Sequence, residues 1–146
     1  MSDPSRSWET SMKKANTIII GAGRMGGSIA RYLNNSANVI IIDKNKDKIS
    51  RLQDFSGFLE VGDATDLQLL EKSGIREADS VIAVTDDDNI NIFIADLCCH
   101  IYNVKDVCIR LKDSRKREIV DKRVNCICPF DLSIEYFENA KKEEVL

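Results

Sequence analysis

A glycine-rich segment near the N-terminus constrains the fold of this chain more than any other feature. The apolar run at residues 17–20 leads directly into the sequence Gly-Ala-Gly-Arg-Met-Gly at residues 21–26, and a second apolar run at residues 39–42 ends in Asp43. A glycine turn between a buried strand and a helix, followed by an acidic residue at the end of the next strand, is typical of βαβ units that bind dinucleotides. The segment therefore predicts a Rossmann-like unit with an adenine-nucleotide site.

Each glycine of this segment has a separate task. Gly21 permits a tight turn out of the strand, Gly23 lets phosphate oxygens approach bare backbone, and Gly26 lets the helix pack closely on the strand. The helix that begins at residues 25–28 directs free N–H groups and the positive end of its dipole at the anion. The turn is thus expected to hold the phosphates.

Asp43 indicates which nucleotide the site would accept. It lies twenty residues after Gly23, where a carboxylate can accept hydrogen bonds from both ribose hydroxyls and would repel a 2′-phosphate. The position favours NAD-type or ATP-type ligands over NADP, although the neighbouring Lys44 weakens this preference.

The length and composition predict one domain that neither binds nucleic acid nor crosses a membrane. The chain has 146 residues, of which 43% are hydrophobic, enough for a single core. Its net charge of −3 gives no basic surface for a phosphate backbone, and no apolar run approaches the ~20 residues that cross a bilayer. With no visible signal peptide, the protein is expected to be cytosolic. We expect a disordered N-terminal tail at residues 1–15 that includes Trp8, a nucleotide-binding domain at residues 16–141 and a C-terminal tail at residues 142–146.

Apolar runs and amphipathic segments alternate along the rest of the chain. The expected strands are residues 17–20, 39–42, 58–61, 80–84, 107–111 and 126–128, and the expected helices begin at residue 25 and then cover residues 46–54, 66–73, 86–102, 115–123 and 131–141. Thr65 would cap the third of these helices, and Gly74 would end it. This order predicts an α/β fold, a doubly wound parallel sheet of about six strands with right-handed crossovers and helices on both faces.

The five cysteines and the single histidine are expected to be structural. Without a signal peptide the thiols would stay reduced, and neither the adjacent pair Cys98-Cys99 nor the spacing Cys126-x-Cys128 matches a common zinc site. We interpret them as buried or partly buried thiols, with metal or redox chemistry as the alternative. His100, late in a helix, is interpreted as a polar contact rather than a catalytic group.

Two charged runs have both a structural and a functional interpretation. Residues 86–88 are all aspartate, which favours the solvated first turn of a helix over a divalent-metal site, because three consecutive carboxylates point in different directions. No metal site is therefore predicted. The basic side chains of the segment 112–123 are interpreted as a solvated helix face rather than a docking patch: Lys112, Arg115, Lys116, Arg117, Lys122 and Arg123.

Several motifs in a fixed order resemble a known family. They are the Gly-x-Gly-Arg-x-Gly turn, Asp43 at a strand end, the sequence Gly-Asp-Ala-Thr at residues 62–65, Asp79 before Val-Ile-Ala-Val-Thr at residues 81–85, the helix start at residues 86–89 and the strand end Ile109-Arg110. Together they resemble the N-terminal lobe of RCK domains, the Trk/Ktr-type regulators of potassium conductance, over about residues 16–138.

The resemblance implies a cytosolic adenine-nucleotide-binding regulatory subunit that docks on a membrane potassium transporter or channel, and that reaches the inner face of the membrane through this partner. Exchange of ATP, ADP or NAD(H) would change the shape of an RCK homodimer or higher oligomer, which requires tighter binding to one assembly state. The chain would assemble with itself or with a separately encoded RCK partner. Full RCK proteins continue with a C-terminal lobe, and here we expect a single lobe.

The same resemblance implies a role for each matching residue. Gly21, Ala22, Gly23, Arg24, Met25 and Gly26 would form the phosphate loop, with Arg24 at the terminal phosphates; Asp43, beside Lys44, would hold the ribose; Asp63 and Ala64 would border the adenine; Thr85 and Asp86 would lie across from the phosphates; and Arg110 would add a second cation. The structural alternatives are a solvated arginine for Arg24 and helix-capping turns for Asp63 and for Thr85 with Asp86.

The last expected helix carries Leu132, Ile134, Tyr136 and Phe137 on its apolar side. This side would either cross onto a twin subunit or cover the chain's own sheet. The sequence leaves both arrangements open.

Two other functions compete with the regulatory one. A small NAD-dependent oxidoreductase would share the phosphate loop, but it needs an acid or base beside the nicotinamide, and the chain has no Tyr-x-x-x-Lys pair and no suitably placed histidine. We therefore expect no enzymatic activity. A nucleotide-sensing module unrelated to potassium transport is the third interpretation.

Overall fold

The computed structural model of the protein describes residues 14–145. The expected N-terminal tail, with Trp8, lies almost entirely outside the described residues. The six strands form one parallel sheet in the order β3-β2-β1-β4-β5-β6. Their bounds are β1 Ala15–Ile20, β2 Ala37–Asp43, β3 Phe58–Val61, β4 Ser80–Ala83, β5 Asp106–Arg110 and β6 Asn125–Ile127.

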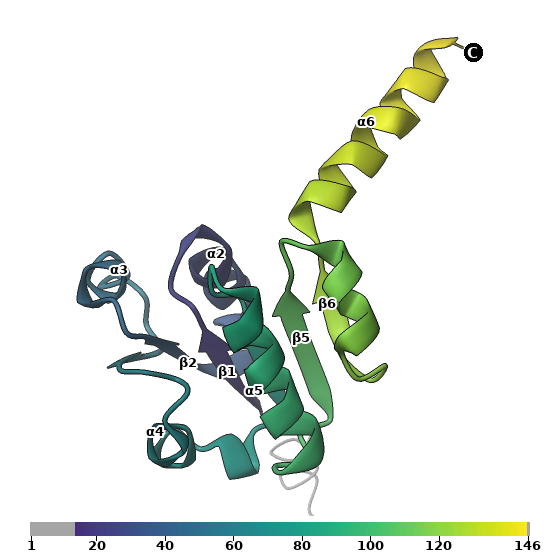
Figure 1. The fold of residues 1–146 in the computed structure, drawn as a ribbon. Coiled ribbons are helices and arrows are strands. Elements are labelled where there is room, and N and C mark those ends of the chain that lie inside the picture. Colours follow the sequence, from purple (N-terminus) through teal and green to yellow (C-terminus); the bar gives the residue numbers. More distant parts are fainter. Residues whose placement is uncertain (1–13, 146) are drawn as a thin grey trace, which may run out of the picture.

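Helices cover both faces of this sheet (Figure 1). They are α2 Arg24–Leu33, α3 Lys46–Ser50, α4 Leu67–Lys72, α5 Asp88–His100 and α6 Pro129–Val145, with two short 3-10 helices, η1 Ile75–Glu77 and η2 Ser114–Ile119. The architecture confirms the expected doubly wound α/β fold. Among the described residues, none of the helices has the length and apolar character needed to cross a membrane.

Two hydrophobic cores lie on opposite faces of the sheet, because side chains alternate along each strand. Ile18 and Ile20 of β1 belong to the core beneath α4 and α5, whereas Ile19 belongs to the core beneath α2 and α3. All three side chains are at most 2% exposed. Strands that are buried on both faces need continuous apolar runs, which explains why the first two strands were recognisable from sequence.

The order of the strands determines where a ligand can enter. The chain runs from β1 outward to β2 and β3, then returns to the other side of β1 with β4. Ile20 at the end of β1 is in register with Ile42 and with Ala83, so three strands end together at this point. In open parallel sheets, ligands bind at the carboxyl ends of the strands where the direction of winding reverses.

Several expected helices differ from those in the structure. The cap of α4 is Asp66, whose carboxylate accepts the N–H of Gln68 at 3.0 Å, so the prediction that Thr65 caps it was wrong. Gly74 does end this region, with a left-handed φ of 92°. Helix α3 stops at Ser50, four residues earlier than expected.

The expected helix at residues 115–123 is instead the short helix η2. Two aspartates explain the difference, because each accepts the backbone N–H two residues later and so favours a turn over a longer helix. Asp113 binds Arg115 in this way at 3.0 Å, and Asp121 binds Arg123 at 2.9 Å. Both arginines form ion pairs with these aspartates and remain exposed. Because Lys112, Lys122 and Arg123 lie outside η2, the interpretation of the basic side chains as one helix face was wrong.

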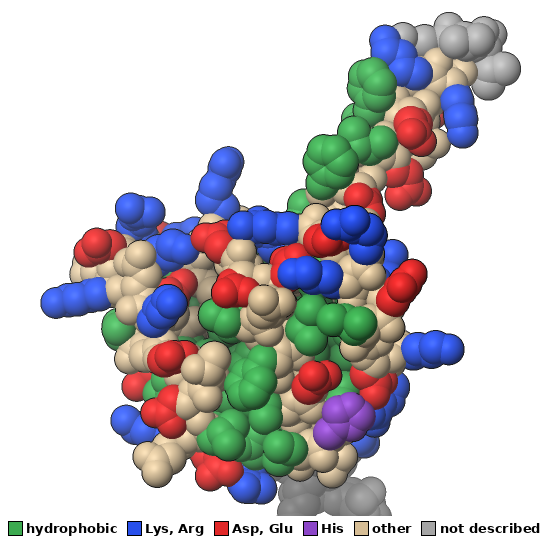
Figure 2. All heavy atoms as spheres, viewed as in Figure 1, with side chains coloured by type: hydrophobic (Ala, Val, Ile, Leu, Met, Phe, Trp, Pro, Cys, Tyr) green, Lys and Arg blue, Asp and Glu red, His purple; other side chains and the backbone are tan. Residues whose placement is uncertain are grey.

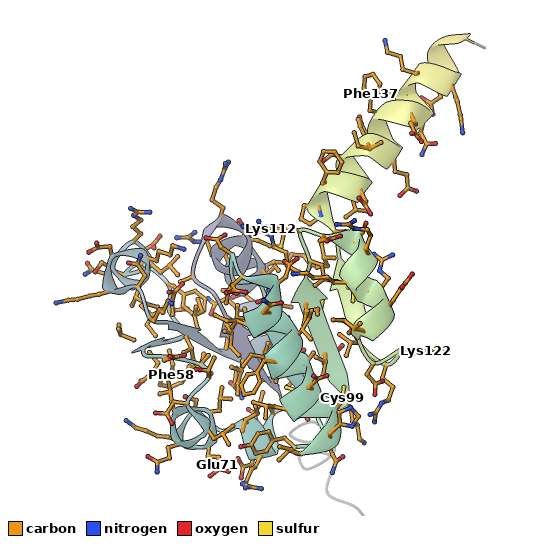
Figure 3. All side chains as sticks on the ribbon, in the orientation of Figure 1. Phe58, Glu71, Cys99, Lys112, Lys122 and Phe137 are labelled. Atoms are coloured by element: carbon orange, nitrogen blue, oxygen red, sulfur yellow. The ribbon has the colours of Figure 1, made fainter. Side chains whose placement is uncertain are left out.

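Helix α6 projects away from the sheet (Figures 1 and 3), and Phe137 on it lies far from the core. It starts earlier than expected because Pro129 suits the first helical position. It also continues through residues 142–145, the stretch assigned to a C-terminal tail. The alternative that this helix covers its own sheet was therefore wrong. Large apolar side chains along it remain between 42% and 79% exposed: Phe130, Leu132, Ile134, Tyr136 and Phe137.

The cysteines are buried or partly buried free thiols, and the histidine makes a polar contact, both as expected. Cys98, Cys99 and Cys128 are buried free thiols, and burial raises the pKa of Cys98 to about 12 and that of Cys108 to about 11. His100 is the last residue of α5, and its Nε2 atom lies 3.7 Å from the Asp121 carboxylate. Raised pKa values keep the thiols of Cys98 and Cys108 protonated and unreactive at neutral pH.

Candidate functional site

A cleft of about 1140 Å³ opens at the carboxyl ends of the strands. This volume is somewhat larger than the roughly 300–1,000 Å³ of most small-molecule pockets, so a cofactor has room in it. Its walls come from the segments that follow β1, β2, β3, β4 and β5, and from Pro129 at the base of α6. Of the thirteen candidate residues, twelve line this cleft: Gly21, Ala22, Gly23, Arg24, Met25, Asp43, Lys44, Asp63, Ala64, Thr85, Asp86 and Arg110. Gly26 lies behind the wall.

The three glycines of the turn lie in different environments. Gly21 has a φ of 110°, and a Cβ atom there would lie 2.8 Å from the carbonyl oxygen of Val84. A Cβ atom on Gly26 would overlap the carbonyl oxygen of Gly21. Both positions therefore require glycine for the turn and for close packing of the helix on the strand. Gly23 has a φ of −77°, and no described atom lies within 4 Å of its Cβ position, so its side faces open space.

The N-terminus of α2 faces the cleft with its first N–H groups free of any side-chain cap. Gly23 occupies the cap position, and the first turn has no acidic residue. Free N–H groups and the positive end of a ten-residue helix favour a bound anion. Arg24 lies in this first turn, exposed to solvent, where a cation opposes the helix dipole.

Asp43 organises the cleft in a way that the sequence motif did not indicate. Its Oδ2 atom accepts the N–H of Ala22 at 2.8 Å, and its Oδ1 atom accepts the N–H of Asn45 at 2.8 Å. The carboxylate thus joins the glycine turn to the start of α3. Each oxygen keeps a second lone pair that can accept a ligand hydroxyl.

Asp63 forms a turn at the end of β3. Its Oδ1 atom accepts both the N–H and the hydroxyl of Thr65, at 2.9 and 2.7 Å. These two hydrogen bonds stabilise the carboxylate and hold the pKa of Asp63 below its ordinary value. Ala64 is almost fully buried beside it. The turn is local, since Asp66 caps α4.

Asp86 stands on the other side of the cleft between two cations. Lys48 Nζ and Arg110 Nη1 each lie 3.5 Å from one of its carboxylate oxygens. The Nε atom of Arg110 is buried and has no hydrogen-bond partner among the described residues. Arg110 therefore has donor capacity left for an anion. Lys48, on α3, was missed by sequence reasoning, since only the fold brings it next to Asp86.

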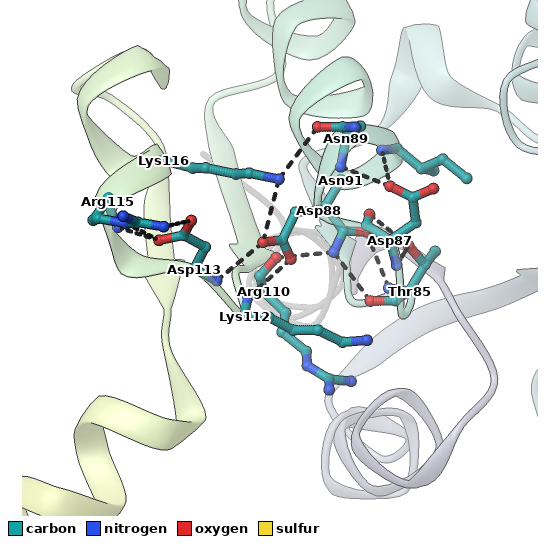
Figure 4. A network of polar contacts seen from close by, with 11 residues as sticks. Thr85, Asp87, Asp88, Asn89, Asn91, Arg110, Lys112, Asp113, Arg115 and Lys116 are labelled. Carbon is teal, nitrogen blue, oxygen red and sulfur yellow. Dashed lines mark hydrogen bonds and ion pairs between the residues drawn. The ribbon is translucent and has the colours of Figure 1, made fainter.

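The three consecutive aspartates have three different environments, and Figure 4 shows those of Asp87 and Asp88. Asp86 forms the ion pairs above, and Asp87 caps α5 by accepting the N–H of Asn89 at 2.8 Å. Asp88 is buried and accepts the backbone N–H groups of Lys112 and Asp113, at 2.8 and 3.0 Å. The interpretation of residues 86–88 as a solvated turn was therefore wrong for Asp88. Among the described residues, no group of three or more His, Cys, Asp or Glu side chains is placed to hold a metal ion.

Comparison with known proteins identifies the family. The family model of the TrkA-N domain matches residues 17–127. A Trk system potassium uptake protein TrkA homolog from Pyrococcus abyssi is 35% identical over 107 residues, which cover 72% of this chain and 47% of that protein. This chain spans about half the length of the curated relatives that it matches.

Solved structures share the fold. The GsuK RCK domain agrees with a TM-score of 0.74 at 24% identity, over 89% of this chain and 28% of that one. The Kef CTD of Shewanella denitrificans in its AMP-bound form agrees with a TM-score of 0.70 at 23% identity, over 87% of this chain and 80% of that one. The resemblance to RCK domains is confirmed, and because the family match covers most of its length, this chain belongs to the TrkA-N domain family.

Proposed function

We propose that this chain is an adenine-nucleotide-binding regulatory domain of a potassium uptake system. The observation that carries the proposal is the uncapped N-terminus of α2, which faces a cleft between Asp43 on one side and Arg110 on the other. A hydroxyl acceptor, an anion-binding helix end and a cation in this order suit a ribose followed by phosphates. Membership of the TrkA-N family supports the link to potassium uptake.

The adenosine half of the ligand would lie over β1, β2 and β3. Asp43 would accept hydrogen bonds from the ribose, and Asp63 with Ala64 would border the adenine. The glycine turn would bind the phosphates, with Arg24 and Arg110 beside them. An anionic Asp43 supports ATP, ADP or NAD(H) over NADP, and the AMP in the Kef CTD supports an adenine ligand.

A binding role is favoured over catalysis. The Asp43 oxygens accept backbone N–H groups, and Asp86 and Asp87 are taken up by ion pairs and by a helix cap. A general acid or base must reach the proton that it transfers, and these carboxylates already have partners in the protein. We therefore propose ligand-dependent control of a partner protein as the output.

The partners of this domain would be a second copy and a membrane potassium transporter or channel at the cytoplasmic face. Helix α6 supports the second copy, because exposed apolar side chains gather on one side of this projecting helix (Figure 2). Hydrophobic surface of this extent is typical of protein–protein interfaces. A nucleotide would then act by binding one arrangement of the pair more tightly than another.

The first experiment titrates ATP, ADP, AMP, NAD⁺, NADH and NADPH into the protein by calorimetry, with Asp43→Asn as the test variant. Asp106→Asn is the control, because Asp106 lies at the opposite end of the sheet, where within residues 14–145 its carboxylate accepts a hydrogen bond from the Ser80 hydroxyl alone. We expect micromolar binding of an adenine nucleotide that D43N weakens about tenfold or more and D106N leaves intact. Equal affinities of wild type and D43N, or no binding of any nucleotide, would refute the site.

The link to transport has its own test. Potassium uptake would be measured in cells that carry the transporter, with and without this chain and with its D43N variant. A rate that depends on the chain but not on Asp43 would contradict nucleotide control.

A further inference from the structure

Asn91 is a fully buried polar side chain on the first turn of α5, and it does not line the cleft. Its Oδ1 atom accepts the N–H of Thr85 at 3.0 Å and the Thr85 hydroxyl at 2.7 Å. Its Nδ2 group donates to the carbonyl oxygens of Thr85 and Arg110, at 3.1 and 2.9 Å. All four hydrogen bonds of the amide are thus made inside the protein.

These hydrogen bonds connect the segments that follow β4 and β5, beyond the point where the two strands stop pairing. The last paired residues of β4 and β5 are Ala83 and Ile109. Beyond this pair the Asn91 side chain lies between the two backbone segments and bonds to both (Figure 4). Asn91 therefore fixes the spacing between the backbone at Thr85, next to Asp86, and the backbone at Arg110.

Arg110, which Asn91 holds in this way, has hydrogen-bond donors that could bind an anion. Arg110 has a buried Nε atom without a partner among the described residues, and its ion pair with the exposed Asp86 is long at 3.5 Å. A guanidinium binds phosphate strongly only when its donors are aimed at the oxygens. A small displacement of the Arg110 backbone would therefore lower the affinity for the ligand.

We propose that Asn91 is a positioning residue for the phosphates that lie beyond the one attached to adenosine. It holds Arg110 and the Thr85–Asp86 segment against the far half of the cleft, across the glycine turn from Asp43. The inference rests on the proposed nucleotide site and goes beyond it, since Asn91 acts without touching the ligand. ATP and ADP should depend on Asn91, and AMP should not.

The test variant is Asn91→Asp, which keeps the acceptor for the Thr85 N–H and hydroxyl and removes the donor to the carbonyl oxygens of Thr85 and Arg110. Affinities for ATP and AMP would be measured by calorimetry for wild type, N91D, Arg110→Ala and the double variant. The control is Val107→Ala, a core change on the same strand that lies outside the cleft lining. If N91D does not fold, Asn91→Ser is read in the same way.

We expect N91D to lower the affinity for ATP about tenfold and to leave the affinity for AMP within about twofold of the wild-type value. We also expect no additional loss when N91D is combined with R110A, because both changes remove the same contact. V107A should keep the wild-type ratio of ATP to AMP affinity.

Equal weakening of ATP and AMP by N91D, or losses that add in the double variant, would show that Asn91 only stabilises the fold. A different result would separate this inference from the proposed function. If wild type binds both AMP and ATP, R110A lowers the affinity for ATP alone and N91D changes neither affinity, this inference fails and the proposed function stands. If wild type binds no adenine nucleotide, both fail.

Discussion

Alanine at Gly26 and at Gly23 should separate the folding of the glycine turn from its binding. A methyl group on Gly26 would overlap the Gly21 carbonyl oxygen and lie 2.9 Å from its carbon, with Val84 Cγ2 at 3.4 Å. Backbone, rather than a flexible side chain, must then move. Overpacking costs about 1–3 kcal/mol and more where the backbone must shift, so we expect Gly26→Ala to lose at least about 3 kcal/mol of the roughly 5–15 kcal/mol typical of a domain.

Gly23→Ala should leave the stability nearly unchanged. Its φ of −77° suits alanine, and the added methyl group meets no described atom within 4 Å. A lower entropy of the unfolded chain stabilises by about 0.4–1 kcal/mol, and the poorer helix cap offsets this, which leaves a net change within about 1 kcal/mol. The methyl group nevertheless occupies the space where phosphate oxygens would approach the backbone.

Urea unfolding and calorimetric titration of ATP measure the two effects on the same samples. We expect G23A to fold like wild type and to bind ATP about tenfold more weakly or worse, since each 1.4 kcal/mol of lost contact is about a factor of ten. Wild-type stability of G26A would contradict the packing argument. Wild-type affinity of G23A would contradict the assignment of the phosphate site.

Three further predictions concern other parts of the molecule. Tyr136→Glu with Phe137→Glu should convert a dimer to a monomer in light scattering, and an unchanged mass would exclude α6 as the interface. Thr65→Val should raise the pKa of Asp63 towards its ordinary value, which carboxyl-carbon NMR titrations would measure. Because the native pKa of Asp63 is lowered, its carboxylate stabilises the fold at pH values above its unfolded pKa. This stabilisation is lost as the pH falls through the native pKa. Cys98, whose pKa is about 12, should react with a thiol reagent at pH 8 only after unfolding.

The parts of the fold that sequence predicted are those determined by neighbouring residues. Gly21 is required by its own φ of 110°, and Gly26 by contact with a turn only five residues away. The runs around Ile19 and Ile41 are apolar throughout because both faces of those strands are buried. Asp43 follows from its strand end, although its hydrogen bonds to the turn became visible only in the structure.

The residues that sequence could not place depend on partners far along the chain. Asp86, Asp87 and Asp88 are chemically identical, but Asp86 precedes α5, Asp87 is its extended cap and Asp88 is its first helical residue. Asp88 accepts the backbone N–H groups of Lys112 and Asp113, which pairing of β4 with β5 brings alongside. Asn91 reaches Arg110 for the same reason. No local pattern distinguishes these residues from solvated ones.

The direction of α6 follows from the length of the link that precedes it. Three residues separate β1 from α2, and four separate β4 from α5, and both of these helices turn back to cover the sheet. Only Cys128 separates β6 from α6, which leaves too little chain to reverse direction, since αβ and βα links generally need two residues or more. The helix therefore continues away from the sheet (Figure 1). Its apolar side can be buried only against a surface other than its own sheet, which is why we place the contact with a second copy there rather than on the helices that cover the cores.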